Sequence, residues 1–489
     1  TLEATAAAAR ELAQALTGLP EVVDVETYAG TSAPFNFNGL VRHYFLRSGP
    51  TVADLQVNLL PKHERERASH PFAKSLRPIL APIAARHGAN VKVSEVPPGP
   101  PVLSTLVAEI YAPTLEERLR LAARVRTIFE QTPGVVDVDW YVEEPGPRLE
   151  LAVDREKAAR AGISPEMVAR TVRVALAGAP AARLHDPRAR EPVPIVLRLP
   201  RASRSSAEGL LALDLHGADG RLVPLSELVA AEPAERERFV YHKNLRPVTY
   251  VIGEVAGAAE SPVYALLDMG ERIEALTDAS GNAVEILFSG EPADSTRPVL
   301  KWDGEWQITY EVFRDMGIAF AVVLVLIYLL VVGWFRSFVT PLIIMAPIPL
   351  TLIGIVPAHA LGGAFFTATS MIGFIALAGI IVRNSILLVD FVNLELASGV
   401  ALETAIVRAA AVRFRPIALT AAALVVGGTV ILLDPIFQGL AVALIAGVVV
   451  STGLTLVVIP LLYYMYLSAA GTAGIVPARA MAVPSEESS

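Results

Sequence analysis

The chain has 489 residues, of which 53% are hydrophobic and none is cysteine. Its mean hydropathy of +0.49 is higher than an ordinary water-soluble protein reaches. A formal net charge of −8 argues against nucleic acid as a partner, and the lack of cysteine excludes disulfide bonds and thiolate metal sites.

The apolar residues are concentrated in the second part of the chain. Residues 1–315 carry charged side chains throughout, whereas residues 317–489 contain no lysine and only six arginines and six acidic residues. This contrast predicts a water-exposed region followed by a membrane region. No signal peptide or membrane segment stands between Thr1 and the water-exposed region, so we expect a fragment or one half of a split protein.

Residues 1–101 alternate as in a split βαβ (ferredoxin-like) subdomain that lacks its first strand. Residues 102–145 and 246–291 repeat the pattern in two pieces, and residues 146–245 are predicted to form an inserted subdomain. The predicted helices are 2–16, 71–86, 114–131, 164–176 and 262–276, and the predicted strands are 22–28, 54–60, 89–96, 105–111, 135–142, 148–153, 193–199, 246–254 and 284–289, with a hairpin at 217–226.

Five apolar segments follow, and each is long enough to cross a bilayer as a helix of about 20 residues. Residues 292–316 are expected to approach the membrane, with Trp302 and Trp306 at its interface. The tail at 468–489 is expected to be cytoplasmic and disordered. The five segments are 317–335, 337–358, 367–392, 416–433 and 437–467, which together make a five-helix region at 317–467.

The arginines of the membrane region indicate its orientation. With five crossings, Arg336, the loop 393–415 and Arg479 fall on one side, and the large water-exposed region falls on the other. Arginine marks the cytoplasmic side of a membrane protein. The large region is therefore predicted to be periplasmic or extracellular.

One arginine does not follow this rule. Arg383, followed by Asn384, interrupts an apolar segment, and an ionisable side chain at the bilayer centre costs at least about 2.5–3.5 kcal/mol. Arg383 would need no explanation at a helix end, but Gly362 and Gly363 predict a turn that places it near mid-depth. We interpret Arg383 as a fixed countercharge for a titrating carboxylate, which must come from outside this chain.

Arg413, Arg415 and Thr420 surround the predicted start of the fourth helix at Pro416. Arg415 is equally well explained as a cytoplasmic anchor. Arg413 and Thr420 are seven residues apart, so they share a face that we expect to meet the Arg383 helix. Small residues are expected to let the two helices pack closely, namely 421–423, 427–428, Gly373, Ala376 and Gly379.

The loop 30–45 carries four aromatic residues, Phe35, Phe37, Tyr44 and Phe45. They either line a site for apolar ligands or pack between subdomains. The eight histidines show no metal-ligand spacing, and the sequence has no phosphate-binding loop or nucleophile elbow. We predict no enzyme active site, no metal site and no cofactor.

Several motifs together resemble the C-terminal half of an inner-membrane transporter of the resistance–nodulation–division (RND) family, in its hydrophobe/amphiphile, AcrB-like branch. These motifs lie at 334–349, 379–391 and 413–420 in the membrane region, and at 98–104 and 219–226 in the water-exposed region. The resemblance covers essentially the whole chain.

The resemblance implies proton-driven efflux of hydrophobic or amphiphilic compounds, with the proton gradient in place of a cofactor. Residues 1–101 and the two-piece subdomain would be porter subdomains, and residues 146–245 a docking (funnel) subdomain. The partners would be an N-terminal half, a homotrimer, a periplasmic adaptor, an outer-membrane channel and membrane lipid. The proton relay would consist of Arg383, Asn384, Arg413 and Thr420, and the gating loop would carry Phe35, Phe37, Tyr44 and Phe45.

One residue departs from the family pattern, because Arg383 stands where the family has lysine. Two alternative functions stay open. A heavy-metal exporter is disfavoured by the lack of cysteine and by having only Met167 and Met269 in the water-exposed part. A membrane-anchored scaffold or protein-export auxiliary would not need the intramembrane polarity of Arg383.

Overall fold

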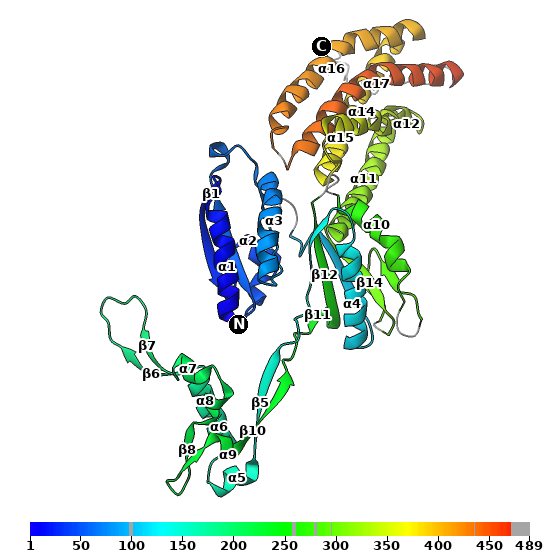
Figure 1. The fold of residues 1–489 in the computed structure, drawn as a ribbon. Coiled ribbons are helices and arrows are strands. Elements are labelled where there is room, and N and C mark those ends of the chain that lie inside the picture. Colours follow the sequence, from blue (N-terminus) through cyan, green and yellow to red (C-terminus); the bar gives the residue numbers. More distant parts are fainter. Residues whose placement is uncertain (97–100, 257–260, 278–280, 295, 435, 471–489) are drawn as a thin grey trace, which may run out of the picture. The chain divides into compact units, whose positions relative to one another are not determined.

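The computed structural model describes residues 1–96, 101–256, 261–277, 281–294, 296–434 and 436–470 (Figure 1). Residues 98–100 of the linker motif at 98–104, most of the predicted tail, and Arg479 lie outside these ranges. The chain divides into two compact units, one of residues 141–247 and one that combines residues 1–140 with the chain from 248 onward.

The first part of the larger unit packs two helices on a two-stranded antiparallel sheet. Helices α1 (Leu2–Thr17) and α3 (Ser69–Arg86) share a core with strands β1 (Val22–Ala29) and β2 (Ala53–Leu59). Two short helical turns lie between the strands, α2 (Phe37–Val41) and η1 (Tyr44–Leu46), and a third, η2 (Lys62–Glu64), follows β2.

The predicted strand at 89–96 is wrong, because the structure assigns no strand to these residues. Val91 and Val93 still pack on the core, which explains the strand-like pattern. The Val93 carbonyl accepts a hydrogen bond from Arg77 Nη2 at 3.3 Å. The Arg77 side chain thus donates to a backbone carbonyl that would pair with a neighbouring strand if residues 89–96 formed part of a sheet.

A six-stranded sheet forms the rest of the water-exposed part of this unit. Strand β12 pairs antiparallel with β3 and β4, β14 pairs antiparallel with β3, and β13 lies parallel to β14 at the edge. Helices α4 and α10 pack against one face. The elements are β3 (Leu106–Tyr111), α4 (Leu115–Glu130), β4 (Val135–Trp140), β11 (Tyr241–Lys243), β12 (Arg246–Val255), α10 (Pro262–Glu274), β13 (Glu285–Leu287) and β14 (Val299–Gly304).

Strand β14 overturns the expectation that Trp302 lies at the membrane interface. The Trp302 side chain is 0% exposed, and its ring stacks on Phe129 with the centroids 5.9 Å apart. Trp306 Nε1 donates a hydrogen bond to the Phe288 carbonyl at 2.7 Å, so this tryptophan is also held by the water-exposed domain. In sequence, a tryptophan close to an apolar helix resembles an anchor at the membrane interface. In the structure, Trp302 lies on strand β14, where successive side chains point to opposite faces, and its side chain points into the core.

The smaller unit joins a helical core to two hairpins and a two-stranded ribbon. Its buried residues include Leu210, Leu225 and Leu228. Strands β5 and β10 form the ribbon, and β6–β7 and β8–β9 form hairpins. The elements are β5 (Pro147–Val153), α5 (Arg155–Arg160), α6 (Pro165–Leu176), β6 (Ala179–Leu184), β7 (Val193–Leu197), α7 (Arg201–Arg204), α8 (Ala207–Leu211), β8 (Asp214–His216), β9 (Leu222–Pro224), α9 (Leu225–Leu228) and β10 (Val229–Glu235).

Five helices or helix groups of the described chain are long and apolar enough to cross a membrane. The second is interrupted near Pro347 and consists of three consecutive pieces. The elements are α11 (Glu305–Phe335), α12 (Thr340–Met345), α13 (Pro347–Leu350), α14 (Leu352–Gly362), α15 (Ala368–Ala397), α16 (Leu402–Ile431) and α17 (Gln438–Ala470).

Helix α16 corrects the predicted loop at 393–415. The helix begins at Leu402, so Pro416 lies inside it instead of in its first turn. At about 1.5 Å per residue a helix of this length exceeds the thickness of a bilayer core. The polar stretch before Pro416 therefore forms helix outside the apolar layer, which a hydropathy boundary cannot distinguish from a loop.

Close packing around α17 replaces the expected close packing between α15 and α16. A Cβ on Gly373 of α15 would lie 3.0 Å from Ala443 of α17, and one on Gly428 of α16 would lie 2.8 Å from Ile445 of α17. A Cβ on Gly379 or Gly427 would meet nothing within 4 Å. The small residues thus let α15 and α16 approach α17 rather than each other.

The six-stranded sheet contains a fully buried ion pair that offers a test of the fold. Lys301 Nζ lies 3.4 Å from Glu109 Oε2, and both residues are 0% exposed. The Tyr111 hydroxyl donates to the same carboxylate at 2.9 Å. Burial, and then the nearby Glu109 charge, raises the pKa of Tyr111.

We expect Lys301→Met to destabilise the protein by about 3–5 kcal/mol, because the Glu109 carboxylate stays buried without its cation. The double variant Lys301→Met/Glu109→Leu is expected to recover most of this loss. Thermal unfolding of the full chain in detergent, followed by tryptophan fluorescence, measures both. A double variant no more stable than the single one would contradict the pairing.

Candidate functional site in the membrane region

Arg383 lies near the middle of the 30-residue helix α15, and its side chain faces away from the other four helices. The neighbouring residues Ile381, Val382 and Ser385 are buried, and they belong to a stripe with helical spacing that faces the bundle core. Within the part of the chain that the structure describes, no hydrogen bond or ion pair involves Arg383. The bundle therefore presents an uncompensated cation on an open face.

The structure does not bring Arg383 together with the other predicted relay residues. The Arg413 guanidinium lies over the Phe391 ring of α15, 5.2 Å from its centroid. The Thr420 hydroxyl donates to the Pro416 carbonyl of its own helix at 2.9 Å. Asn384 is half-buried beside Arg383. Arg413 thus does reach α15, but at a point two turns beyond Arg383.

The faces of the bundle differ in how much they are covered. Helices α11 and α16 bury only 11% of their most apolar stretch, whereas α15 buries 50%. The open faces carry apolar side chains that suit lipid or further helices. The Arg383 face of α15 combines an apolar surface with an unpaired charge near the middle of its helix, and lipid does not solvate such a charge.

Two polar contacts of the bundle were not anticipated from sequence. The Tyr463 hydroxyl of α17 donates to Asn393 Oδ1 of α15 at 2.6 Å, and both residues are buried. His359 at the end of α14 contacts Ser370 of α15, with Nε2 and Oγ 2.9 Å apart. The signal that singled out Arg383, a polar residue within an apolar run, was also present at these positions.

The predicted gating loop separates into exposed and half-buried aromatic residues. Phe35 is 77% exposed and Phe37 is 50% exposed. Phe45 stacks on Phe35 with the centroids 5.1 Å apart, and the Tyr44 hydroxyl reaches Ser94 Oγ at 3.4 Å. Two phenylalanine rings are thus presented on the surface of this chain, whereas Tyr44 is tied to its own subdomain.

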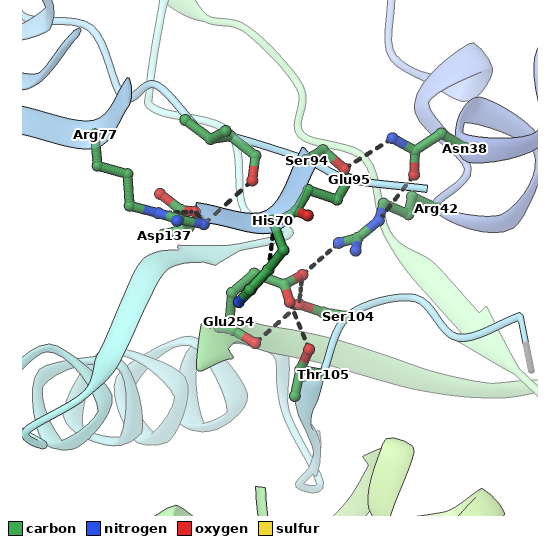
Figure 2. Close-up of polar contacts among 12 residues, drawn as sticks. Asn38, Arg42, His70, Arg77, Ser94, Glu95, Ser104, Thr105, Asp137 and Glu254 are labelled. Carbon is green, nitrogen blue, oxygen red and sulfur yellow. Dashed lines mark hydrogen bonds and ion pairs between the residues drawn. The ribbon is translucent and has the colours of Figure 1, made fainter. Parts of the chain in front are cut away.

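A polar cluster joins the first subdomain to the six-stranded sheet (Figure 2). Arg42, which is 8% exposed, forms an ion pair with Glu254 of β12. Ser104 Oγ and Thr105 Oγ1 donate to the same carboxylate at 2.8 and 2.5 Å. Burial disfavours the charged form of Arg42, but the Glu254 carboxylate and the Tyr44 hydroxyl together outweigh this effect and raise the pKa of the guanidinium.

Further ion pairs between the first subdomain and the sheet place the cation and the carboxylate on the same sides as Arg42 and Glu254 do. Arg77 Nη2 lies 2.7 Å from Asp137 Oδ2, and Lys92 Nζ lies 2.6 Å from Asp139 Oδ2. In each pair the cation belongs to the first subdomain and the carboxylate to the sheet. This complementarity sets the register in which the two subdomains meet.

The methionines of the water-exposed part do not form a thioether site. Met269 is 0% exposed in the core of the six-stranded sheet, whereas Met167 is 44% exposed on α6 of the smaller unit. Among the described residues, no group of three or more His, Asp or Glu side chains could hold a metal ion.

The model of the AcrB/AcrD/AcrF family matches residues 1–467. The chain belongs to this family of RND transporters. Membership and the five apolar helices place it in the inner membrane as a multi-pass protein whose large domain is periplasmic. Arg336 and Arg408 then lie toward the cytoplasm.

Two relatives show the range of the family. The nickel and cobalt resistance protein CnrA of Cupriavidus metallidurans is 26% identical over 472 residues, covering 92% of this chain and 41% of the relative. The multidrug resistance protein MdtC of Serratia proteamaculans is 26% identical over 350 residues, covering 70% of this chain and 32% of the relative. The predicted hydrophobe/amphiphile branch is therefore supported only in part.

A solved structure has the same fold. The crystal structure of a heavy metal efflux pump matches with a TM-score of 0.74 at 24% identity, covering 96% of this chain and 46% of the solved one. This RND chain thus spans less than half the length of the relatives it matches.

The Arg42–Glu254 pair offers a test of how the subdomains of this RND chain are joined. We expect Glu254→Leu to destabilise their contact by about 3–5 kcal/mol, because Arg42 stays buried without its carboxylate. Hydrogen–deuterium exchange at residues 37–46 should accelerate, and Arg42→Met/Glu254→Leu should restore part of the protection. Arg86→Met, which breaks an exposed pair with Glu11, is the control and should change little. Unchanged exchange in Glu254→Leu would contradict the role of the pair.

Proposed function

We propose that this chain is one half of a proton-driven RND efflux transporter and that Arg383 belongs to its proton relay. The observation that carries the proposal is the unpaired guanidinium of Arg383, which is exposed near the middle of the apolar helix α15. A second helix bundle with carboxylates at this depth would cover the face and neutralise the charge. Arginine stays protonated, so the carboxylates carry the proton and Arg383 responds to their charge.

The other relay residues take supporting roles in this proposal. Arg413 holds the α15–α16 contact through the Phe391 ring, and Asn384 and Thr420 supply polar groups near the covered face. Arginine in place of the family lysine keeps the charge but offers a planar fork instead of a point charge. The carboxylates of the second half are therefore expected to engage Arg383 through two hydrogen bonds.

The water-exposed subdomains have proposed roles as well. Residues 1–101 and the pieces 102–145 and 246–291 act as porter subdomains, and residues 146–245 act as the docking subdomain. The β6–β7 hairpin of that subdomain has mostly exposed side chains, which supports a surface for assembly. The working pump is then a homotrimer with a periplasmic adaptor and an outer-membrane channel.

Metal cations are the substrate class that the comparisons support best. Relatives named for nickel, cobalt, zinc and cadmium resistance match 91–93% of the chain, whereas multidrug relatives named MdtC match 70–88%. Amphiphilic compounds are the second candidate, supported by the exposed rings of Phe35 and Phe37. Metal cations and amphiphilic compounds require different side chains along the transport path, so one experiment separates the two substrate classes.

We expect Arg383→Ala in the complete transporter to abolish efflux, a loss of at least about 10²-fold if the charge is obligatory for the relay. Arg383→Lys should retain efflux because it preserves the cation. Arg415→Ala is the matched control, since this exposed arginine of α16 is assigned no relay role. Retained efflux in Arg383→Ala, with normal membrane insertion, would remove Arg383 from the relay.

The substrate class is tested in a host that lacks its own RND pumps. Expression of the complete transporter is expected to raise resistance to nickel, cobalt, zinc or cadmium salts and to leave resistance to an amphiphilic dye unchanged. Phe35→Ala/Phe37→Ala should not affect metal resistance. Dye resistance that depends on these two rings, without metal resistance, would reverse the assignment.

A further inference from the structure

A buried histidine lies where three membrane helices end on the periplasmic side. His359 in the last turn of α14 is 4% exposed, and Ser370 in the first turn of α15 is 0% exposed. The first turn of α17 presses against them, since a Cβ on Gly439 would lie 2.3 Å from Ser370 Oγ. The proposed relay uses none of these residues.

The hydrogen bonds define the tautomer of the neutral imidazole. His359 Nδ1 lies 2.8 Å from the Ile355 carbonyl, which only accepts, so Nδ1 carries the hydrogen. Nε2 is then an acceptor, and the Ser370 hydroxyl donates to it at 2.9 Å. Ser370 Oγ in turn accepts the Thr367 N–H at 3.1 Å, at the start of α15. Neutral His359 is therefore fully satisfied.

The same groups can also accommodate a proton on Nε2. Thr367 Oγ1 lies 3.4 Å from Ser370 Oγ and 2.9 Å from Thr369 Oγ1, and Thr369 donates to the Ile436 carbonyl at 3.2 Å. When Nε2 is protonated it donates to Ser370, whose hydroxyl turns to donate to Thr367 Oγ1. Thr367 then donates to Thr369, which already donates to the Ile436 carbonyl. Ile436 accepts the last hydrogen bond, so only hydroxyl hydrogens move.

The hydroxyl chain connects the buried imidazole to the surface. Thr367 is exposed and Thr369 is half-buried, whereas Ser370 and His359 are buried. A proton from the periplasmic side can thus reach Nε2 through side chains that are already hydrogen-bonded. A histidine packed for structure alone would not need a path to the surface.

We propose that His359 is a second proton-binding site, on the periplasmic side, and that its charge state is transmitted through Ser370 to the N-terminus of α15. This inference rests on the proposed function, because α15 carries Arg383. The N-terminal end of a helix is electropositive, so an imidazolium at Ser370 weakens the start of α15. His359 is therefore a positioning residue for the relay.

The charged groups on the neighbouring elements do not neutralise His359. Asp434, just before α17, accepts the backbone N–H groups of Ile436 and Phe437 at 2.8 and 3.2 Å. On α11, Arg314 and Asp315 pair with each other at 2.8 Å, and Glu311 accepts from Gln307. The remaining charged groups on these helices are Glu305 on α11 and Arg383, Asp390 and Glu395 on α15, and helices α14 and α17 carry no acidic or basic residue besides His359.

Solid-state NMR of the full chain in lipid bilayers, labelled with ¹⁵N-histidine, tests the site directly. The His359 resonance is the one that disappears in His359→Gln, and His63→Gln, at an exposed histidine, is the control. We expect an Nδ1–H tautomer at pH 8 that becomes doubly protonated on lowering the pH to 5, and loss of this response in Ser370→Ala. A resonance that does not respond to pH, an Nε2–H tautomer, or an unchanged response in Ser370→Ala would overturn the proposal.

A transport measurement tests the positioning role. With the total proton-motive force held constant, His359→Gln in the complete transporter is expected to retain efflux but to lose the response of its rate to periplasmic pH, whereas His63→Gln retains that response. A pH dependence equal to that of the wild type in His359→Gln would overturn the coupling. Failure of the proposed relay is distinguishable, because it appears as unchanged efflux in Arg383→Ala and leaves the NMR titration of His359 unaffected.

Discussion

The membrane region depends on one constraint, which is that a bilayer offers no hydrogen bonds. Several polar side chains of the bundle find hydrogen-bond partners within it. Thr420 and Ser385 donate to carbonyls one turn back on their own helices, at 2.9 and 2.7 Å. Asn393 pairs with Tyr463, and His359 pairs with Ser370. Among the described residues, Arg383 has no such partner, and its side chain is exposed on α15.

A second constraint connects the membrane helices to the water-exposed domain. Strand β14 runs directly into α11 through Gly304, whose φ of 72° and 2.6 Å approach of its Cβ position to the Ser104 carbonyl both require glycine. Ser104 and Thr105 also hold Glu254, which holds Arg42 of the first subdomain. One short segment thus contacts both subdomains and the first membrane helix.

The elements that sequence reasoning found are those with strong local periodicity. The helix at 71–86 and the strand at 246–254 carry amphipathic patterns that survive in α3 and β12. The strand expected at 89–96 failed because apolar alternation shows only that side chains meet a core, and not that a neighbouring strand is present. Strand β14 was missed because its six residues directly precede an apolar helix, and the hydropathy of that helix dominates any sequence window that includes the strand.

In the candidate site, too, local sequence patterns predicted some features and tertiary packing decided the others. Sequence alone determined the number of apolar spans and their orientation, and it singled out Arg383 within an apolar segment, because hydropathy and arginine placement are properties of local segments. Only the tertiary structure decided that Arg383 faces outward, that Arg413 lies on Phe391, and that His359 meets Ser370. These facts depend on how helices rotate and pack against one another, and small residues such as Gly439 determine that packing through contacts far apart in the chain.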